Sequence, residues 1–425
     1  GDLDSPVTRL LVELVGNLTQ RVDNLTTALA EAKVEVAQMK GLVRDAMEAG
    51  ACGLATSTLE QHNGENGIPM PSRLADEYEL MELTGVLGEV GKGAFMLTKG
   101  MTSTIPWLES IAANNGRPVM IAAMFVDPGN PERVFNENAQ ISEARQRGRE
   151  LWSQVGCFPL GMEFTLSHPY PLEALIAWHP AIEAEGSEEF KRIIRDPSFR
   201  QGLKDEMQTT GVPNRFSSNN WDHMTIMQVH KAEHEKFIGK KVGHLARDVN
   251  LDPWDWFLDF GLADDLKTLF DVRLFNVDEE RVADLLRYEY GAIALSDAGA
   301  HLSFLCDAGF GLHLMGHWAR NKGTITLEKA VEALTSRPAD IYRIKDRGRL
   351  AVGAWADLML FDPETVGRGN KTRVNDLPSG AGRIDTPAVG LKGVWVNGIR
   401  TVDDNRNIQD CGTPGQLLRD FADAA

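Results

Sequence analysis

The sequence predicts an α/β fold with a parallel sheet, preceded by a long helix and followed by a small β-rich segment. Three observations support this class. Heptad-like apolar spacing fills the amino-terminal segment, and from Ala51 short apolar stretches alternate with helical ones, as in strands joined by crossover helices. After Lys345 the residues alternate in short stretches, which favours a β-rich appendage. We therefore expect three parts, residues 1–46, 47–345 and 346–425.

The first part predicts a helix with a seam of apolar residues. From Leu11 to Val43 these residues are spaced alternately by four and three positions, a 3.5-residue period over almost five heptads. β-Branched residues at one seam position and Leu at the other favour a parallel pair of helices, in which Glu35 and Lys40 pair across the seam. On this interpretation residues 8–46 bind a second copy, giving a homo-oligomer, or a partner chain.

An amphipathic helix packed on its own barrel is the alternative interpretation, and the sequence leaves the two open. Gly16, Asn17 and Asn24 weaken the helix, and the positions that flank the seam carry few charges. Heptad-like runs also occur in the helices of globular domains. The helix itself is the firmer prediction.

The second part is expected to supply the strands of the sheet. Its apolar stretches, separated by helical ones, suit most of an α/β barrel. Residues 165–260, rich in Trp, Pro and Asp, predict a long insertion before the last strands. After those strands, the segment around Thr326 predicts a Thr-capped helix. The expected strands are Cys52–Thr56, Ala94–Thr98, Val119–Phe125, Gln154–Leu160, Val272–Phe275 and Ala292–Leu295.

Composition excludes several classes of partner. The net charge of −17 argues against nucleic acid and against an anionic membrane surface, because both attract basic rather than acidic proteins. The apolar runs are far shorter than a membrane span, and no charged-then-apolar leader precedes them. Four scattered cysteines lack Cys-x-x-Cys spacing, so they predict neither a disulfide framework nor a zinc cluster. We expect a reduced, cytoplasmic protein.

The last expected strand ends next to an acid. Ala292–Leu295 is followed by Ser296-Asp297-Ala298-Gly299-Ala300-His301. A carboxylate at the carboxyl end of a barrel strand faces the active site, where it can ligate a divalent metal and accept a proton from water. The structural alternative is an Asp that caps the turn. We interpret Asp297 as the catalytic and metal-binding residue, and His301 either as a substrate contact or as a structural histidine.

Phrases around this strand and upstream of it are similar to those of the amidohydrolase superfamily. The chain resembles the N-acyl-D-amino-acid deacylases, or D-aminoacylases, over residues 36–400. The resemblance implies a TIM-type barrel of the metal-dependent hydrolase kind, whose last strand supplies Asp297 to a zinc or similar divalent ion. The matching phrases are Ala49-Gly50-Ala51-Cys52-Gly53-Leu54-Ala55-Thr56-Ser57, Glu60-Gln61-His62, Pro71-Ser72-Arg73-Leu74-Ala75, Lys345-Asp346-Arg347-Gly348-Arg349-Leu350 and Gly353-Ala354-Trp355-Ala356-Asp357-Leu358.

The same resemblance exposes a departure in the metal site. Members of the family open their barrel with a strand ending in His-x-His, whose imidazoles bind the metal, and this sequence contains no His-x-His. The expected barrel is therefore incomplete. A metal therefore requires ligands from elsewhere. Zinc or a similar divalent metal is expected if the site is completed, and no metal is expected in the isolated chain.

Three more residues are candidates for substrate binding. His62 and Arg73 lie in a loop after a candidate strand, where barrels place substrate contacts, and an Arg can hold a carboxylate bidentately. Arg320 follows a probable helix and has the same interpretation. For both arginines a surface salt bridge is the structural alternative.

Other histidines, a cysteine and a lysine have weaker claims. His313 and His317 share one helix face and could hold zinc, but ordinary helix-face histidines are the preferred interpretation. The segment from His230 to His234 matches the pattern His-x-x-Glu-His, which we interpret as chance in its charged surroundings. Two other candidates are Cys157, as a soft metal ligand or a small core residue, and Lys99, as a bridging carbamate or part of a turn.

Together these observations predict a hydrolase that cleaves the amide bond of an N-acyl amino acid or a related small amide. The bond is a carbon–nitrogen bond other than a peptide bond, and the enzyme is expected to depend on a divalent metal. The alternative is a catalytically inactive amidohydrolase-like scaffold, or a subunit that needs a partner chain for the missing ligands. An incomplete barrel has open sheet edges, which favour such pairing.

Overall fold

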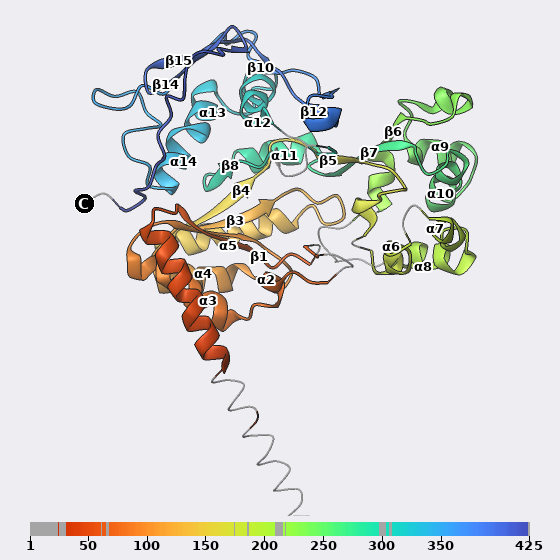
Figure 1. The fold of residues 1–425 in the computed structure, drawn as a ribbon, viewed down its shortest axis with the longest axis horizontal. Coiled ribbons are helices and arrows are strands. Elements are labelled where there is room, and N and C mark those ends of the chain that lie inside the picture. The colour runs from red at the N-terminus through yellow and green to blue at the C-terminus, as the bar shows by residue number, and fades with distance from the viewer. Residues whose placement is uncertain are drawn as a thin grey trace, which may run out of the picture.

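The computed structural model describes residues 24, 31–60, 62–64, 68–173, 175–184, 187–208, 216, 218–296, 303–305 and 308–423. The chain forms a parallel sheet with helices, an insertion around a second sheet, and a β-rich carboxyl-terminal part (Figure 1). None of the described helices has both the length and the apolar character needed to span a membrane.

A five-stranded parallel sheet confirms the α/β class. Its strand order is β1-β2-β3-β4-β8, and every neighbouring pair is parallel. Within the described residues β1 and β8 each pair on one side only, so the sheet is open there. The strands are β1 (Gly53–Ser57), β2 (Ala94–Thr98), β3 (Val119–Met124), β4 (Leu151–Val155) and β8 (Gly291–Ile293).

Helices cover one face of this sheet because alternate strand residues are apolar and point toward them. Phe95, Leu97 and Ile121 are fully buried in that core. The helices start at polar caps, such as Asp76 and Thr104, whose side chains accept hydrogen bonds from the first turn. The helices between the strands are α2 (Pro71–Leu74), α3 (Glu77–Val90), α4 (Ile105–Asn115), α5 (Arg133–Gln146) and α11 (Glu279–Leu286).

The opposite face of the sheet, which we call the inner face, has a smaller apolar cluster. Met120 and Ala292 are buried there against Ile341 at the end of α14 (Ser336–Ile341). Met96, Trp152 and Tyr342 pack around them. Strand alternation therefore gives this face thioethers and aromatic rings, while the branched residues face the helices.

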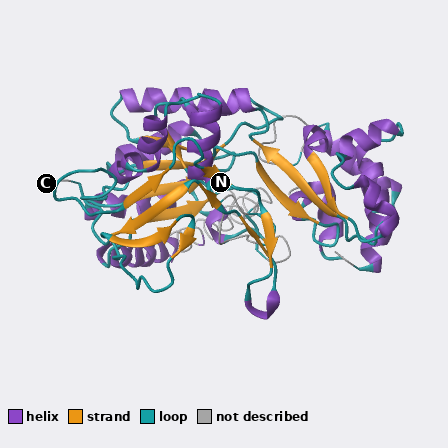
Figure 2. Ribbon diagram, turned by 90° about the horizontal axis from the view of Figure 1, so that it is seen from above, coloured by secondary structure: helices purple, strands orange, loops and turns teal. Residues whose placement is uncertain are grey.

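Residues 160–275, which extend beyond the predicted insertion of 165–260 at both ends, form a second, antiparallel sheet with its own core (Figure 2). We call this part the insertion. Its order is β5-β7-β6, and buried rings such as Trp178, Trp254 and Phe257 fill the space between sheet and helices. The elements are β5 (Leu160–Phe164), β6 (Met224–Gln228), β7 (Leu269–Phe275), α6 (His179–Ile182), α7 (Glu188–Ile193), α8 (Pro197–Met207), α9 (Val242–Asp248), α10 (Pro253–Ala263) and 3-10 turns at Tyr170–Leu172, Ile176–Trp178, Ser218–His223 and Ala232–Phe237.

Two strand predictions were correct only in part. Val272–Phe275 belongs to β7 of the antiparallel sheet, not to the barrel, because a short apolar run looks the same in either setting. The stretch Gln154–Leu160 contains the end of β4 and the first residue of β5, with residues 156–159 outside both strands.

The carboxyl-terminal part begins with helices and ends in short antiparallel strands. Thr326 caps α13 by accepting a hydrogen bond from the Lys329 amide, as predicted. A four-stranded sheet follows in the order β16-β15-β14-β9. The elements are α12 (Phe310–His313), a π-helical segment (Leu314–Asn321), α13 (Leu327–Leu334), β9 (Leu358–Phe361), β10 (Gly367–Arg368), β11 (Thr372–Val374), a 3-10 turn (Pro378–Gly380), β12 (Arg383–Asp385), β13 (Ala388–Val389), β14 (Leu391–Val396), β15 (Ile399–Asp403) and β16 (Arg406–Asn407).

The amino-terminal helix is described over residues 31–48, where it packs on α3 of its own chain. Val36 and Met47 are buried, and Lys40 Nζ lies 2.6 Å from a carboxylate oxygen of Glu82. Within the chain Glu82 binds the Lys40 ammonium, and pairing of Lys40 with Glu35 of a second helix stays a prediction. The rest of the seam, from Leu11 to Leu29, lies outside the described residues.

Candidate active site at the carboxyl edge of the parallel sheet

A serine–histidine pair ends the first strand. Ser57, the last residue of β1, pairs in register with Thr98 at the end of β2. The Ser57 hydroxyl lies 2.6 Å from Nδ1 of His62 and accepts a hydrogen bond from the Leu59 amide at 3.2 Å. His62, predicted as a substrate contact, is thereby fixed at the edge where α/β proteins bind ligands.

The loops after β1 and β2 are joined by hydrogen bonds. The Thr58 hydroxyl lies 2.7 Å from the Ser103 hydroxyl and accepts from the Gly100 amide at 2.9 Å. A carboxylate oxygen of Glu60 accepts from the Met101 amide at 2.8 Å. A Cβ on Gly100 would collide with the Thr58 carbonyl, so only glycine permits this approach. The two loops form one platform beside the Ser57–His62 pair.

The segment that follows β8 carries the predicted acid. Asp297 and His301 both lie outside the described residues, so their roles remain predictions. The described chain resumes at Ser303, and the Phe304 carbonyl accepts a hydrogen bond from the Glu163 amide of β5 at 2.9 Å. The end of this segment is therefore fixed to the insertion.

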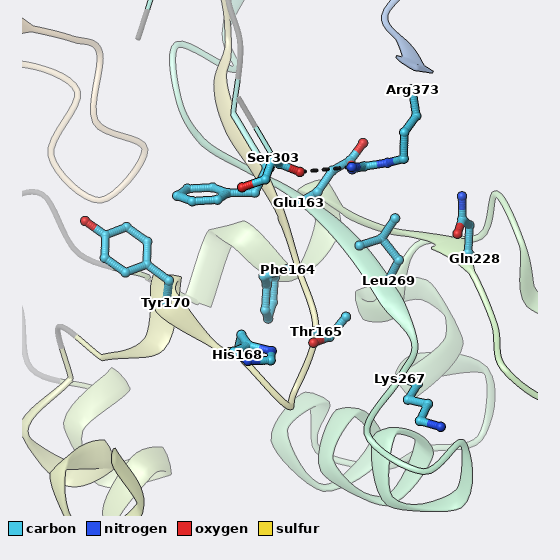
Figure 3. Close-up of a pocket in the computed structure, with 11 residues that line it drawn as sticks. Glu163, Phe164, Thr165, His168, Tyr170, Gln228, Lys267, Leu269, Ser303 and Arg373 are labelled. Carbon is cyan, nitrogen blue, oxygen red and sulfur yellow. Dashed lines mark hydrogen bonds and ion pairs between the residues drawn. The ribbon is translucent and has the colours of Figure 1, made fainter. Parts of the chain in front are cut away.

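A cavity of about 410 Å³ lies beside Ser303 and Phe304 (Figure 3). Arg373 bridges its rim by an ion pair with Glu163 and a 3.1 Å hydrogen bond to the Ser303 carbonyl. Residues of the β5-β7-β6 sheet and of the segments next to its strands form the rest of the lining, so the cavity sits on the insertion rather than over the ends of β1 to β4. Its lining includes Phe164, Thr165, His168, Tyr170, Gln228, Lys267 and Leu269.

The two predicted substrate arginines contact protein groups. Arg73 donates to the side-chain oxygen of Asn63, which keeps it beside the His62 loop. Arg320 donates to the Val366 carbonyl and to Asn321, and so links the π-helical segment to the strands that follow. Of the two, only Arg73 lies next to another predicted site residue.

His313 and His317 are stacked at the carboxyl end of β4. Their rings lie 4.7 Å apart at 13°, and Phe158 lies 4.4 Å from the His313 ring. His317 Nε2 is 2.9 Å from a Glu279 oxygen. Burial, reinforced by the neighbouring His317 and Arg368, lowers the pKa of His313 to about 3, so this imidazole is neutral at physiological pH.

The His-x-x-Glu-His pattern is part of a structural network. His234 Nδ1 lies 2.7 Å from Asp264, a fully buried carboxylate that also accepts from the His230 and Lys231 amides and the Thr268 hydroxyl. Burial alone would raise the pKa of Asp264, but these hydrogen bonds outweigh it and lower the pKa. The carboxylate therefore stays ionised and orders the turn.

Cys157 and Lys99 also have structural partners. Cys157 is buried, and its thiol lies 3.5 Å from the Phe310 carbonyl. Lys99 Nζ forms a 2.9 Å ion pair with Glu137 of α5, so it points to the helix side of the sheet.

The described residues do not fit a metal centre. They contain no group of three or more His, Cys, Asp or Glu side chains placed to hold a metal ion. Among the described imidazoles at the ends of β1 to β4, His62 is bound to Ser57, and His313 and His317 are stacked on each other with Glu279 beside His317. Any metal ligands must therefore include residues beyond this described set.

Two residues at this edge were missed by the sequence analysis. Ser57 was not predicted as a site residue, although a His five residues after a Ser at the end of a strand is a detectable signal for such a pair. Gln154, near the end of β4, carries a buried amide oxygen with no partner. A polar residue in an otherwise apolar strand was the available signal for it.

Comparisons with known proteins agree with this fold. Residues 292–402 match the amidohydrolase family. The chain is 38% identical over 155 residues to N-acyl-D-glutamate deacylase from Alcaligenes xylosoxydans xylosoxydans, covering 36% of this chain and 29% of that protein. It is 24% identical over 348 residues to an uncharacterised protein of Mycobacterium tuberculosis, covering 78% of this chain and 56% of the relative. The matched region thus spans 29% of the length of the first relative and 56% of the second.

Solved structures share the fold. N-acyl-D-glutamate deacylase from Bordetella bronchiseptica, complexed with zinc and a phosphonate inhibitor, superposes with a TM-score of 0.56 at 21% identity, covering 91% of this chain and 66% of that one. D-aminoacylase gives a TM-score of 0.54 at 18% identity, covering 91% and 67%. The chain therefore shares its fold with D-aminoacylase and N-acyl-D-glutamate deacylase, and its residues 292–402 are similar to the amidohydrolase family.

Proposed function

We propose that the chain hydrolyses a carbon–nitrogen bond other than a peptide bond, in an N-acylated amino acid or a related small amide. The observation that carries this proposal is the family match over residues 292–402, which includes the strand end with Asp297. The shared fold with deacylases supports it. Because the chain spans only part of its relatives, the activity is a proposal for the protein that contains it.

Asp297 is the proposed acid–base residue. A carboxylate at the end of the last parallel strand can take a proton from the attacking water and return it to the leaving amine. His62, Arg73, His301 and Arg320 are the proposed substrate contacts. Arg73 reaches a substrate carboxylate only by exchanging its Asn63 partner, whereas Arg320 must leave the Val366 carbonyl.

A divalent metal, zinc or similar, is part of the proposal. The similar structure of N-acyl-D-glutamate deacylase is complexed with zinc, and D-aminoacylase has a binuclear metal centre. Since the described residues lack a three-ligand group, Asp297 must be joined by other ligands. A partner chain bound through residues 8–46 is one source. We also propose the division into a helix over residues 1–46, a barrel-like part over 47–345 and a β-rich domain over 346–425.

A second candidate is an inactive scaffold or subunit. It is favoured by the open edges of β1 and β8 in the described chain and by the full engagement of His62 and Lys99 with protein partners. Such a chain would bind small amides without cleaving them, or would become active only with a partner.

The test is a deacylation assay on a panel of N-acetyl-D- and N-acetyl-L-amino acids, with and without added Zn²⁺, alongside metal analysis of the purified protein. Release of free amino acid that requires metal and disappears in Asp297→Asn supports the enzyme. Absence of turnover with every substrate, in protein that remains folded and free of metal, contradicts an autonomous enzyme and supports the scaffold.

A further inference from the structure

Gln154 lies on the inner face of the parallel sheet, near its carboxyl edge. It pairs in register with Ala292 of β8, which is buried on that face, and follows Trp152 by two residues on the same strand. Ser57 and Thr98, the last residues of β1 and β2, pair in register at the carboxyl edge of the same sheet. Because Thr98 follows the inner-face residue Met96 by two positions, strand alternation places Gln154 and Thr98 on the same face of the sheet.

The Gln154 side-chain amide has poor partners. The residue is 9% exposed, and its Oε1 accepts no hydrogen bond from any group in the described chain. Its Nε2 donates only to the thioether of Met96, at 3.8 Å. The nearby Tyr342 hydroxyl likewise donates to the thioether of Met120, at 3.7 Å. Thioether sulfur is a weak acceptor, so this face holds polar groups without matching protein partners.

Such a group calls for an explanation, because buried polar atoms in native proteins are nearly always paired. An apolar residue of the same size would remove the unpaired oxygen at no loss of packing. The oxygen is an acceptor, so the molecule that satisfies it must bring an N–H or O–H donor. The amide nitrogen of an N-acyl amino acid carries one such N–H.

We propose that Gln154 contacts the substrate, its Oε1 accepting the N–H of a secondary amide at the inner face of the sheet. This inference rests on the proposed function, since it names which group of an N-acyl amino acid is recognised. It predicts that tertiary amides, which have no N–H, are rejected, because they leave the buried oxygen unpaired.

The test compares N-acetylglycine with N-acetylsarcosine, which differ in that the second has a methyl group in place of the amide hydrogen. Dissociation constants are measured by calorimetry for the wild-type chain, Gln154→Met and Gln154→Leu. Ser153→Ala is the matched control: Ser153 is the adjacent residue, is fully buried and also has an unpaired oxygen, but it points to the helix side. Thermal unfolding of each variant is recorded in parallel.

The wild type should bind N-acetylglycine at least tenfold more tightly than N-acetylsarcosine. Gln154→Met and Gln154→Leu should lose that preference while unfolding at an equal or higher temperature, and Ser153→Ala should keep it. In isotope-labelled wild type, N-acetylglycine but not N-acetylsarcosine should shift the Gln154 side-chain amide signals, which decides the question if both variants fail to fold.

Equal affinity for the two compounds, no binding of either, or loss of the preference in Ser153→Ala overturns the inference. So does a preference that survives both Gln154 substitutions, which would assign the unpaired oxygen to a bound water. Hydrolysis is assayed separately. If the protein prefers N-acetylglycine but hydrolyses neither compound, the proposed enzymatic function is wrong and the Gln154 contact is still supported.

Discussion

The hydroxyl of Ser57 lies 2.6 Å from Nδ1 of His62, five residues farther along the chain. Because the hydroxyl also accepts the Leu59 amide, it fixes the first turn of the loop that follows β1. The imidazole in turn stands at the base of a loop closed by the Asn63–Pro69 bridge. The Ser57 hydroxyl thus positions His62, a predicted substrate contact, and orders the loop around it.

Replacing Ser57 by Ala should loosen this loop. The expected loss of unfolding free energy is about 1 to 3 kcal/mol, because two hydrogen bonds are lost, and amides in residues 58–64 should exchange faster. Urea denaturation and hydrogen exchange check this. Ser57→Thr keeps the hydroxyl and serves as control. Equal exchange in Ser57→Ala and wild type would show that the loop is held by other contacts.

Acid should destabilise the protein through His313. Its pKa is about 3 in the folded state, below its ordinary value, so protonation favours the unfolded chain. The contribution of neutral His313 to the free energy of unfolding is fully present above the pKa of an unfolded histidine, about 6.5, and it is lost as the pH drops toward 3. Between pH 7 and pH 5 the loss from this residue is about 1 to 2 kcal/mol.

His313→Phe tests that assignment. Phenylalanine keeps a ring against Phe158 and has no titrating group, so the variant should lose less stability than the wild type between pH 7 and pH 5. Urea denaturation at both pH values gives the comparison. An identical pH dependence in the two proteins would show that the loss of stability in acid comes from other groups, such as the paired carboxylates.

Asp297→Asn should lower metal affinity and abolish any amidase activity, because Asn keeps the shape but loses the charge that binds a cation and accepts a proton. The circular dichroism spectrum and the melting temperature should stay nearly unchanged. Metal analysis and the deacylation assay provide the measurements. A variant that unfolds with no change in metal content would make Asp297 a structural cap.

Substituting Leu18 and Leu25 by Asp should dissociate an oligomer formed through the amino-terminal helix, since each unpaired buried charge costs on the order of several kcal/mol. Sedimentation velocity reports the change. Val34, which is 58% exposed, supplies the control Val34→Asp. An unchanged sedimentation coefficient in the double variant means that these leucines form no interface.

The carboxyl-terminal tail should be needed for full stability. Asp423 lies 2.6 Å from Arg117, whose side chain is nearly buried before β3, and 2.7 Å from Arg343. Asp423→Asn leaves the Arg117 charge without its partner and should cost about 1 to 3 kcal/mol in urea denaturation. Asp410→Asn, at an exposed position, is the control. Equal stability of both variants would show that the tail packs weakly on the rest of the chain.

Local patterns in the sequence determined much of the parallel sheet. Ala94–Thr98 was predicted to the residue, because its apolar run is bounded by glycines and lies between two helical stretches. The cap at Thr326 and the family phrases around Asp297 were equally local. These features depend on residues close together in the chain, which is the range over which hydrophobic period and turn chemistry carry information.

Contacts across the chain were decided only by the tertiary structure. Period-two alternation indicates which residues of a strand share a face, but it does not indicate which strand is the neighbour. The sequence could therefore not distinguish β7 from a barrel strand. Lys40 has several acidic residues within reach in the sequence, and packing on α3 gives it Glu82. The unpaired oxygen of Gln154 likewise exists only because strand β4 turns it to a face lined by thioethers, a balance of burial and pairing set by distant neighbours.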